Sequence, residues 1–132
     1  MGNVRVVEEL FVRIPTKVGL FADVAKSLGK VGVDVRAIGA YDKADSAEFH
    51  MLTGDNDAAV LALVDLGATI ERNDVVVVEL EQRAGKLLAI GEKLQKAKIN
   101  IDWIYATTGD GEHTNVVIKT SDAEKTAQVL GG

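Results

Sequence analysis

An internal repeat is the feature of this sequence that most constrains its fold. When the chain is shifted by 66 residues, Val18–Phe21 falls on Ala84–Leu87. One extra loop residue makes the shift 67 further on, where Thr53–Asp55 meets Thr120–Asp122. Few residues are identical, but the apolar positions coincide over about 55 residues. The repeat predicts two copies of one folding unit.

Each copy has the pattern of strand, helix, two strands and a second helix. Alternating Leu10, Val12 and Ile14 indicate the first strand. Apolar residues at spacings of three and four indicate a helix from about Gly19 to Lys30, and a second helix is predicted over 56–66. With a short last strand, the order is β-α-β-β-α-β, the ferredoxin-like unit. The predicted fold class is therefore α+β, with two such units in tandem and antiparallel sheets that carry helices on one face.

The predicted unit boundaries are 1–72 and 73–132, and the second unit ends without an evident last strand. Its final helix is predicted over 122–130, and Ser121 with Glu124 has the spacing of a capping box. The chain then reaches its end. Either this strand is dispensable, or another segment, such as part of a partner chain, covers the open edge.

Strand alternation also predicts which side chains face the helices. In the second strand of each copy, we expect Val35 and Ala37, and likewise Trp103 and Tyr105, to point inward. The opposite face would then carry apolar side chains that suggest burial against another copy or subunit. These residues are Phe11, Ile38, Val75, Val77 and Ile104.

Composition excludes several classes of protein. The net charge of −5 is spread evenly, with 7 Lys and Arg against 10 Asp and Glu in residues 1–66 and 8 against 10 in the rest. Without a basic lobe, nucleic-acid binding is not expected. The absence of cysteine excludes disulfides and thiolate metal sites. The start lacks a signal-peptide pattern, and no apolar run approaches the ~20 residues of a membrane span, so we expect a cytoplasmic protein with no membrane partner.

The sequence gives little support for catalysis. It has no phosphate-binding loop, Gly-x-Ser-x-Gly or His-Glu-x-x-His motif, so we expect neither enzymatic activity nor a cofactor. His50 and His113 do not superpose in the repeat, and no metal site is predicted. A small acyl-phosphate hydrolase shares the ferredoxin-like topology and remains a remote alternative. It would need an arginine in the first loop, where Arg83 is the sole candidate.

The loop after the first strand carries a more specific pattern in both copies. A polar loop and a glycine are followed by Leu-x-x-(Val/Ile)-x-x-x-Leu, and then by a strand that opens Val-Asp-Val or Ile-Asn-Ile. The pattern begins at Arg13 and again at Glu79. It resembles the ACT domain. Over nearly its full length, the chain is similar to the small stand-alone tandem ACT proteins.

The resemblance implies a regulatory homodimer that binds a free amino acid where two ACT units meet and signals occupancy to an enzyme or regulator. The family's ligand contacts lie in the loop between the first strand and helix, and on the second strand of a neighbouring unit. The residues that match these positions are Thr16, Lys17, Val18, Gly19, Leu20, Gln82, Arg83, Ala84, Gly85, Lys86, Asn100 and Ile101.

Elementary chemistry favours that placement but leaves an alternative open. A glycine at a helix start lets a ligand approach the backbone, and the free amides of the first turn attract a carboxylate. Gly19 and Gly85 can equally be turn residues without a ligand. The family commonly has proline before this glycine, where the chain has Val18 and Ala84. The alternative is a structural or protein-interaction module that has lost ligand binding.

Overall fold

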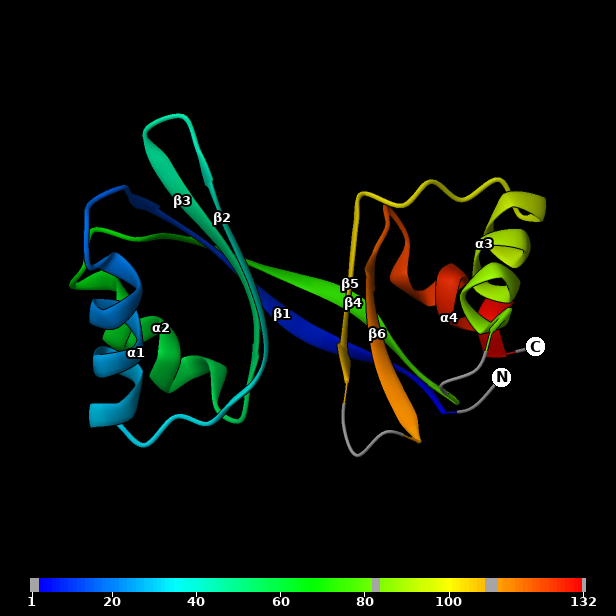
Figure 1. Cartoon of the computed structure of the whole chain (residues 1–132), viewed down its shortest axis with the longest axis horizontal. Coiled ribbons are helices and arrows are strands. Elements are labelled where there is room, and N and C mark those ends of the chain that lie inside the picture. The colour runs from blue at the N-terminus through cyan, green and yellow to red at the C-terminus, as the bar shows by residue number, and fades with distance from the viewer. Residues whose placement is uncertain (1–2, 82–83, 109–111, 132) are drawn as a thin grey trace. The chain divides into compact units, whose positions relative to one another are not determined.

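A computed structural model describes residues 3–81, 84–108 and 112–131 (Figure 1). The strands and helices follow one another as β1 (Val4–Pro15), α1 (Leu20–Lys30), β2 (Val35–Lys43), β3 (Ser46–Thr53), α2 (Asn56–Val64), β4 (Thr69–Glu81), α3 (Lys86–Lys96), β5 (Trp103–Thr108), β6 (His113–Lys119) and α4 (Ala123–Gly131). The described strands form a sheet in the order β2-β3-β1-β4-β6-β5. The ladders of β3 with β1 and β2, and of β6 with β4 and β5, are antiparallel. The predicted α+β fold of tandem ferredoxin-like units is confirmed.

The chain divides into two compact units that do not follow the midpoint of the sequence. The first unit comprises residues 9–73, and the second comprises residues 1–8 together with 74–132. Within each unit the two helices pack against each other, α1 with α2 and α3 with α4 (Figure 1). The sequence placed residues 1–8 in the first unit, whereas the structure groups them with the second repeat.

The beginning of β1 supplies the strand that the second repeat lacks. The backbone amide of Glu79 donates to the carbonyl of Asn3 at 2.9 Å, and Val4 and Val6 pack against the core of the second unit. In the same way, β4 starts in the first unit, where Ile70 packs against the core. The edge beside β4 is therefore covered by the chain itself, because β1 and β4, of 12 and 13 residues, are long enough to serve both units.

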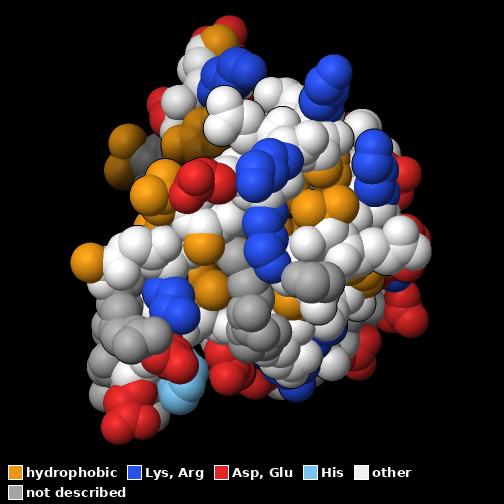
Figure 2. Space-filling model, turned by 90° about the vertical axis from the view of Figure 1, so that its right-hand side faces the viewer, with side chains coloured by type: hydrophobic (Ala, Val, Ile, Leu, Met, Phe, Trp, Pro, Cys, Tyr) orange, Lys and Arg blue, Asp and Glu red, His pale blue; other side chains and the backbone are white. Residues whose placement is uncertain are grey.

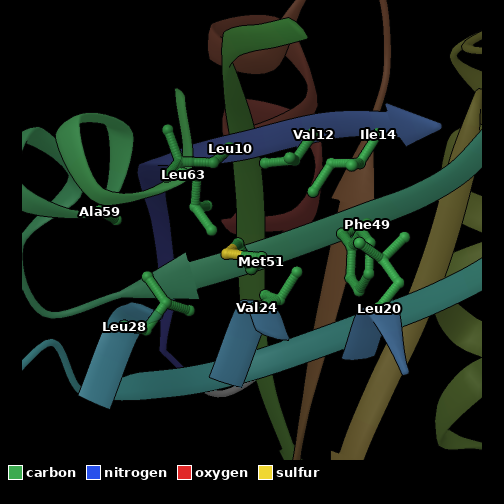
Figure 3. Close-up of a cluster of buried hydrophobic side chains, with 10 residues drawn as sticks. All are labelled: Leu10, Val12, Ile14, Leu20, Val24, Leu28, Phe49, Met51, Ala59 and Leu63. Carbon is green, nitrogen blue, oxygen red and sulfur yellow. The ribbon is translucent and has the colours of Figure 1, made fainter. Parts of the chain in front are cut away.

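The first-unit core lies between α1, α2 and the strands (Figure 3). On α1, three buried residues recur at a spacing of four, so that they form one stripe on the helix. The stripe faces alternate residues of β1 and β3, and α2 adds Ala59 and Leu63 (Figure 3). The buried residues are Leu10, Val12, Ile14, Leu20, Val24, Leu28, Phe49, Met51, Ala59 and Leu63.

The repeat extends to the capping of α2 and α4. A carboxylate oxygen of Asp55, and likewise of Asp122, accepts a bond from the amide three residues later, at 3.1 and 3.0 Å. In each copy a threonine hydroxyl, of Thr53 or Thr120, accepts from the amide of that aspartate at 3.2 Å. The predicted capping box was wrong by one residue: Asp122, not Ser121, caps α4, because the threonine turn presents the aspartate to the first helical turn.

The orientation predicted for β2 was wrong from Ala37 onward, whereas Val35, opposite Thr53, lies on the predicted helix side. Ile38 lies directly opposite Met51, a residue of the helix-facing core, so Ile38 shares the helix side. Ala37 pairs with Leu52 and faces the other way. The cause is a register shift between Val35 and Ala37, since one extra residue reverses the alternation of all that follow.

β5 shows the same reversal. Ile104 lies opposite the core residue Ile118, whereas Trp103 and Tyr105 lie on the face away from the helices. Regular pairing starts only at Trp103, after a bend at Asp102. On the helix side, Ile104 remains 45% exposed.

Candidate functional site

The loops that precede α1 and α3 have the same backbone turn. Gly19 and Gly85 occupy the N-cap positions in the left-handed region, with φ of 84° and 88°. A Cβ built at either position would meet no atom within 4 Å. The glycine is therefore required by the backbone conformation and not by lack of space.

α1 and α3 differ from α2 and α4 at their first turns. No described side chain caps α1 or α3, whereas an aspartate caps each of the other two helices. At α1, the amide of Leu20 donates to the carbonyl of Lys17 at 3.2 Å and that of Asp23 to Gly19 at 3.1 Å. An uncapped helix start presents amides and the positive end of the helix dipole to an anionic group.

The loop before α1 is attached to the β2–β3 hairpin. The Thr16 hydroxyl donates to a carboxylate oxygen of Asp42 at 2.5 Å, and the Thr16 amide donates to the carbonyl of Asp45 at 2.9 Å. The Lys17 ammonium lies 3.0 Å from the carboxylate of Asp23 on α1. These bonds hold the loop beside the hairpin and leave Asp42 next to the start of the helix.

A cavity of about 360 Å³ lies between this loop, α1 and the hairpin. Of the five residues predicted in the loop, Val18 is fully exposed and does not line it. The predicted residues that do are Thr16, Lys17, Gly19 and Leu20. Sequence reasoning missed the other lining residues, which are Phe21, Ala40, Tyr41, Asp42, Ala47 and Phe49. For Ala47 and Phe49 a signal was available, because the alternation of the third strand places both on the side of α1.

In the second unit, a cavity of about 480 Å³ is lined by Glu79, Leu80, Glu81, Lys86, Ala89, Lys93 and His113. Of the predicted residues that the structure describes, Lys86 alone is among them. Ala84 and Gly85 are exposed and do not line it, and Gln82 and Arg83, including the arginine of the hydrolase alternative, fall outside the described residues. On the side where α3 and α4 lie, Lys and Arg side chains are spread among hydrophobic ones (Figure 2).

The two residues predicted from the second strand do not line either cavity. Asn100 is exposed, and Ile101 is half-buried against the core of the second unit. Both precede β5, which begins at Trp103. The structure thus brings the first predicted loop to a cavity, whereas Asn100 and Ile101 are in neither lining.

The face of the first-unit sheet away from the helices carries a buried polar pair. His50 Nδ1 lies 3.5 Å from Glu9 Oε1, and both side chains are almost fully buried. The ring of Phe11 stacks on His50 with centroids 4.8 Å apart, and the Tyr41 hydroxyl lies 3.4 Å from His50 Nε2. Phe11 is half-buried on this face, as the alternation predicted.

Tyr41 also forms part of an acid–base cluster with Glu48 and Arg13. The pKa of the Glu48 carboxyl is lowered despite its burial, first by a hydrogen bond from Tyr41. The Arg13 guanidinium, whose Nε lies 3.1 Å from Glu48, lowers it further. The same bond to Glu48 raises the pKa of Tyr41. Tyr41 is thus a residue of two sites: it lines the cavity, and it also contacts His50 and Glu48.

Within residues 3–81, 84–108 and 112–131, no group of three or more His, Cys, Asp and Glu side chains is arranged to hold a metal ion. In the same part of the chain, no helix is both long and apolar enough to span a bilayer.

The family model of the ACT domain pair matches residues 5–131. The chain belongs to the ACT domain pair family. This confirms the resemblance found in the loops. Comparison with curated protein sequences gives no match.

Solved structures share this fold over almost the whole ACT pair. A protein from Bacteroides thetaiotaomicron is 25% identical, with a TM-score of 0.87, over 97% of this chain and 88% of its own. The regulatory subunit of aspartate kinase from Thermus thermophilus, in its ligand-free form, is 18% identical with a TM-score of 0.64, over 97% and 94%. A structure of aspartokinase alpha and beta subunits is 19% identical with a TM-score of 0.66, over 98% and 95%.

Proposed function

We propose that this ACT pair is a non-catalytic regulatory protein that binds a free amino acid and signals its occupancy to a partner enzyme or regulator. The observation that carries the proposal is the uncapped start of α1 beside a cavity, while α2 and α4 are capped by aspartates of the chain. The regulatory role of the structurally similar aspartate kinase subunit supports it.

In this proposal the ligand carboxylate binds the amides of the first turn of α1, where Gly19 permits close approach. The ammonium group donates to an oxygen of Asp42, which lines the same cavity and is bonded to Thr16 of the loop. Regulation follows by linkage: a ligand that binds one conformation more tightly shifts the protein toward it, and a partner that distinguishes the two conformations responds.

A homodimer is part of the proposal. β2 and β5 are the outer strands of the described sheet, and an outer strand offers free backbone groups to a second chain. Light scattering at micromolar concentration is expected to give twice the chain mass of 14.0 kDa. A monomer that binds amino acids would contradict the dimer and leave the binding role intact.

The second candidate is an interaction module without a ligand. It is favoured by the apolar side chains that α2 exposes, since Leu61 is 73% and Val64 48% exposed. Exposed apolar side chains that gather on one helix are typical of protein contact surfaces. The two candidates differ in one measurable property, which is a saturable site for a small molecule.

Thermal unfolding against the twenty L-amino acids tests the proposal. A ligand at a hundred times its dissociation constant stabilises by ~2.7 kcal/mol, and we expect a selective rise in Tm of roughly 5–10 °C. Gly19→Ala is expected to abolish the rise. Gly32→Ala, which imposes similar backbone strain at φ 69° without lining the cavity, is expected to retain it. No rise with any amino acid would contradict binding and favour the interaction module.

A further inference from the structure

We infer that the cavity of the first unit selects an amino acid with an uncharged, apolar side chain, and that the cavity of the second unit does not bind the same ligand. The inference rests on the proposed amino-acid binding and adds the class of ligand and the number of sites per chain. It predicts one site for an apolar amino acid in each chain.

The wall opposite the loop is apolar in the first unit. Leu20 is 6% exposed and Phe49 2%, so both present core surface to the cavity. Phe21, 59% exposed, stands at its margin, and the two alanines of the hairpin leave space. An apolar ligand side chain would leave water on entering this space, which favours binding.

The charged groups of this cavity are few and already engaged. The Lys17 ammonium is paired with Asp23 at 3.0 Å, and Asp42 accepts from Thr16. A carboxylate can accept further bonds, so Asp42 still has an acceptor for the ligand ammonium. A second charge on the ligand side chain would be desolvated against apolar atoms, which costs binding free energy. Charged amino acids are therefore disfavoured.

Hairpin geometry places the two parts of this site together. Ala40 lies opposite Phe49, and Asp42 lies opposite Ala47, so all four residues belong to the helix-facing side of the β2–β3 ladder. This side adjoins the uncapped end of α1, because Thr16 is bonded to Asp42. The apolar wall, the ammonium acceptor and the helix start therefore surround one space.

The second unit has different chemistry at the matching position. The shift of 66 places Lys86 where the first unit has Leu20. Of the described residues that line the second cavity, most are ionisable: Glu79, Glu81, Lys86, Lys93 and His113. An apolar side chain gains little beside charged groups that prefer water. The repeat thus yields two unlike cavities and only one suited to an apolar ligand.

Isothermal titration calorimetry of the full chain tests the inference with leucine, phenylalanine, lysine and glutamate as probes. We expect leucine or phenylalanine to bind at one site per chain, at least tenfold more tightly than lysine or glutamate. Asp42→Asn is expected to weaken binding because it removes the charge opposite the ammonium. Asp45→Asn is the control, since its side chain does not line the cavity.

Phe21 and Leu87 provide a matched pair for locating the site. They occupy the same repeat position and are similarly exposed, at 59% and 61%, but of the two cavities described above, Phe21 lines the first and Leu87 lines neither. We expect Phe21→Ala to weaken binding of the apolar probe about tenfold and Leu87→Ala to leave it unchanged. Both positions are on the surface, so both variants are expected to fold.

The experiments distinguish failure of the proposed function from failure of this inference alone. If none of the twenty amino acids binds, the proposed function fails and this inference fails with it. If lysine or glutamate binds more tightly than leucine and phenylalanine, or if two equal sites bind per chain, only the inference is overturned. It is also overturned if Leu87→Ala weakens binding while Phe21→Ala does not.

Discussion

The two units are built from one repeat, yet they differ at the first inward position of the helix that follows the glycine. In the first unit this residue is Leu20, which is 6% exposed and belongs to the core. In the second it is Lys86, half-buried beside a cavity lined by charged residues. A duplicated fold therefore does not imply duplicated chemistry, because Leu at this position in one unit and Lys in the other give the two neighbouring cavities different linings.

The second unit accommodates this lysine without losing its core. Ile90 and Leu94, further along α3, are each 1% exposed and pack with the valines of β4 and β6. The long stem of a lysine can lie along apolar surface while its ammonium reaches water. The remainder of the helix thus holds α3 in place, and its first turn is free to differ between the units.

The largest expected effect compares equivalent core positions. Leu28 and Leu94 coincide in the repeat and are 3% and 1% exposed. Truncating either leucine to alanine is expected to cost about 2–5 kcal/mol of unfolding free energy, through lost burial and a residual cavity. Because β1 and β4 contribute residues to both cores, we expect one cooperative transition in each variant.

Urea unfolding followed by circular dichroism and by fluorescence of Trp103, which lies in the second unit, checks this expectation. The two signals are expected to coincide. If Leu28→Ala shifted the circular dichroism transition and left the Trp103 transition unchanged, the shared strands would not couple the units.

Reciprocal exchange at the position that distinguishes the units is expected to have a smaller and unequal effect. Leu20→Lys removes a buried leucine from the first core, and we expect it to cost about 1.5–3 kcal/mol. Lys86→Leu adds apolar volume beside an open cavity and is expected to change stability by less than about 1 kcal/mol. Chemical denaturation of both variants gives the comparison. Equal costs would mean that the two positions do not differ in their contribution to a core.

The helices and strands could be predicted from the sequence, but which core each of them joins could not. The spacing of Leu20, Val24 and Leu28 was sufficient to predict α1, because a helix stripe is a local property. The glycine turns were likewise local. The sharing of β1 between two units was not predictable in this way, since the pattern shows that Val4 and Val6 are apolar but not which core they join.

The errors at the candidate site have related causes. A single register shift next to Ala37 reversed the faces of β2, and the sequence contains no separate signal for it. The contribution of Asp42 to the cavity depends on how the hairpin meets the loop, which is a tertiary contact. The loop itself was predicted because the glycine and the helix pattern are adjacent in the sequence.

The smallest expected effect concerns acid pH and again separates the units. Glu48 corresponds to Asn115 in the repeat, so only the first unit has a titrating group at this position. Hydrogen bonds from Tyr41 and Arg13 lower the pKa of Glu48 in the folded protein. Its ionised form therefore stabilises the fold fully above the ordinary glutamate pKa of about 4.3, and the contribution is lost as pH falls through the lowered value.

Glu48→Gln removes this contribution, and we expect the stability difference from the original chain to shrink as pH falls below about 4.3. The difference should be modest, because Tyr41 and Arg13 are exposed and solvent screens their interactions. Denaturation between pH 3 and 7 measures it, with Asn115→Gln as the control that introduces no titrating group. If the difference in unfolding free energy between Glu48→Gln and the original chain stayed constant over this range, Glu48 would titrate alike in the folded and unfolded chains. The two units would then not differ in their response to acid.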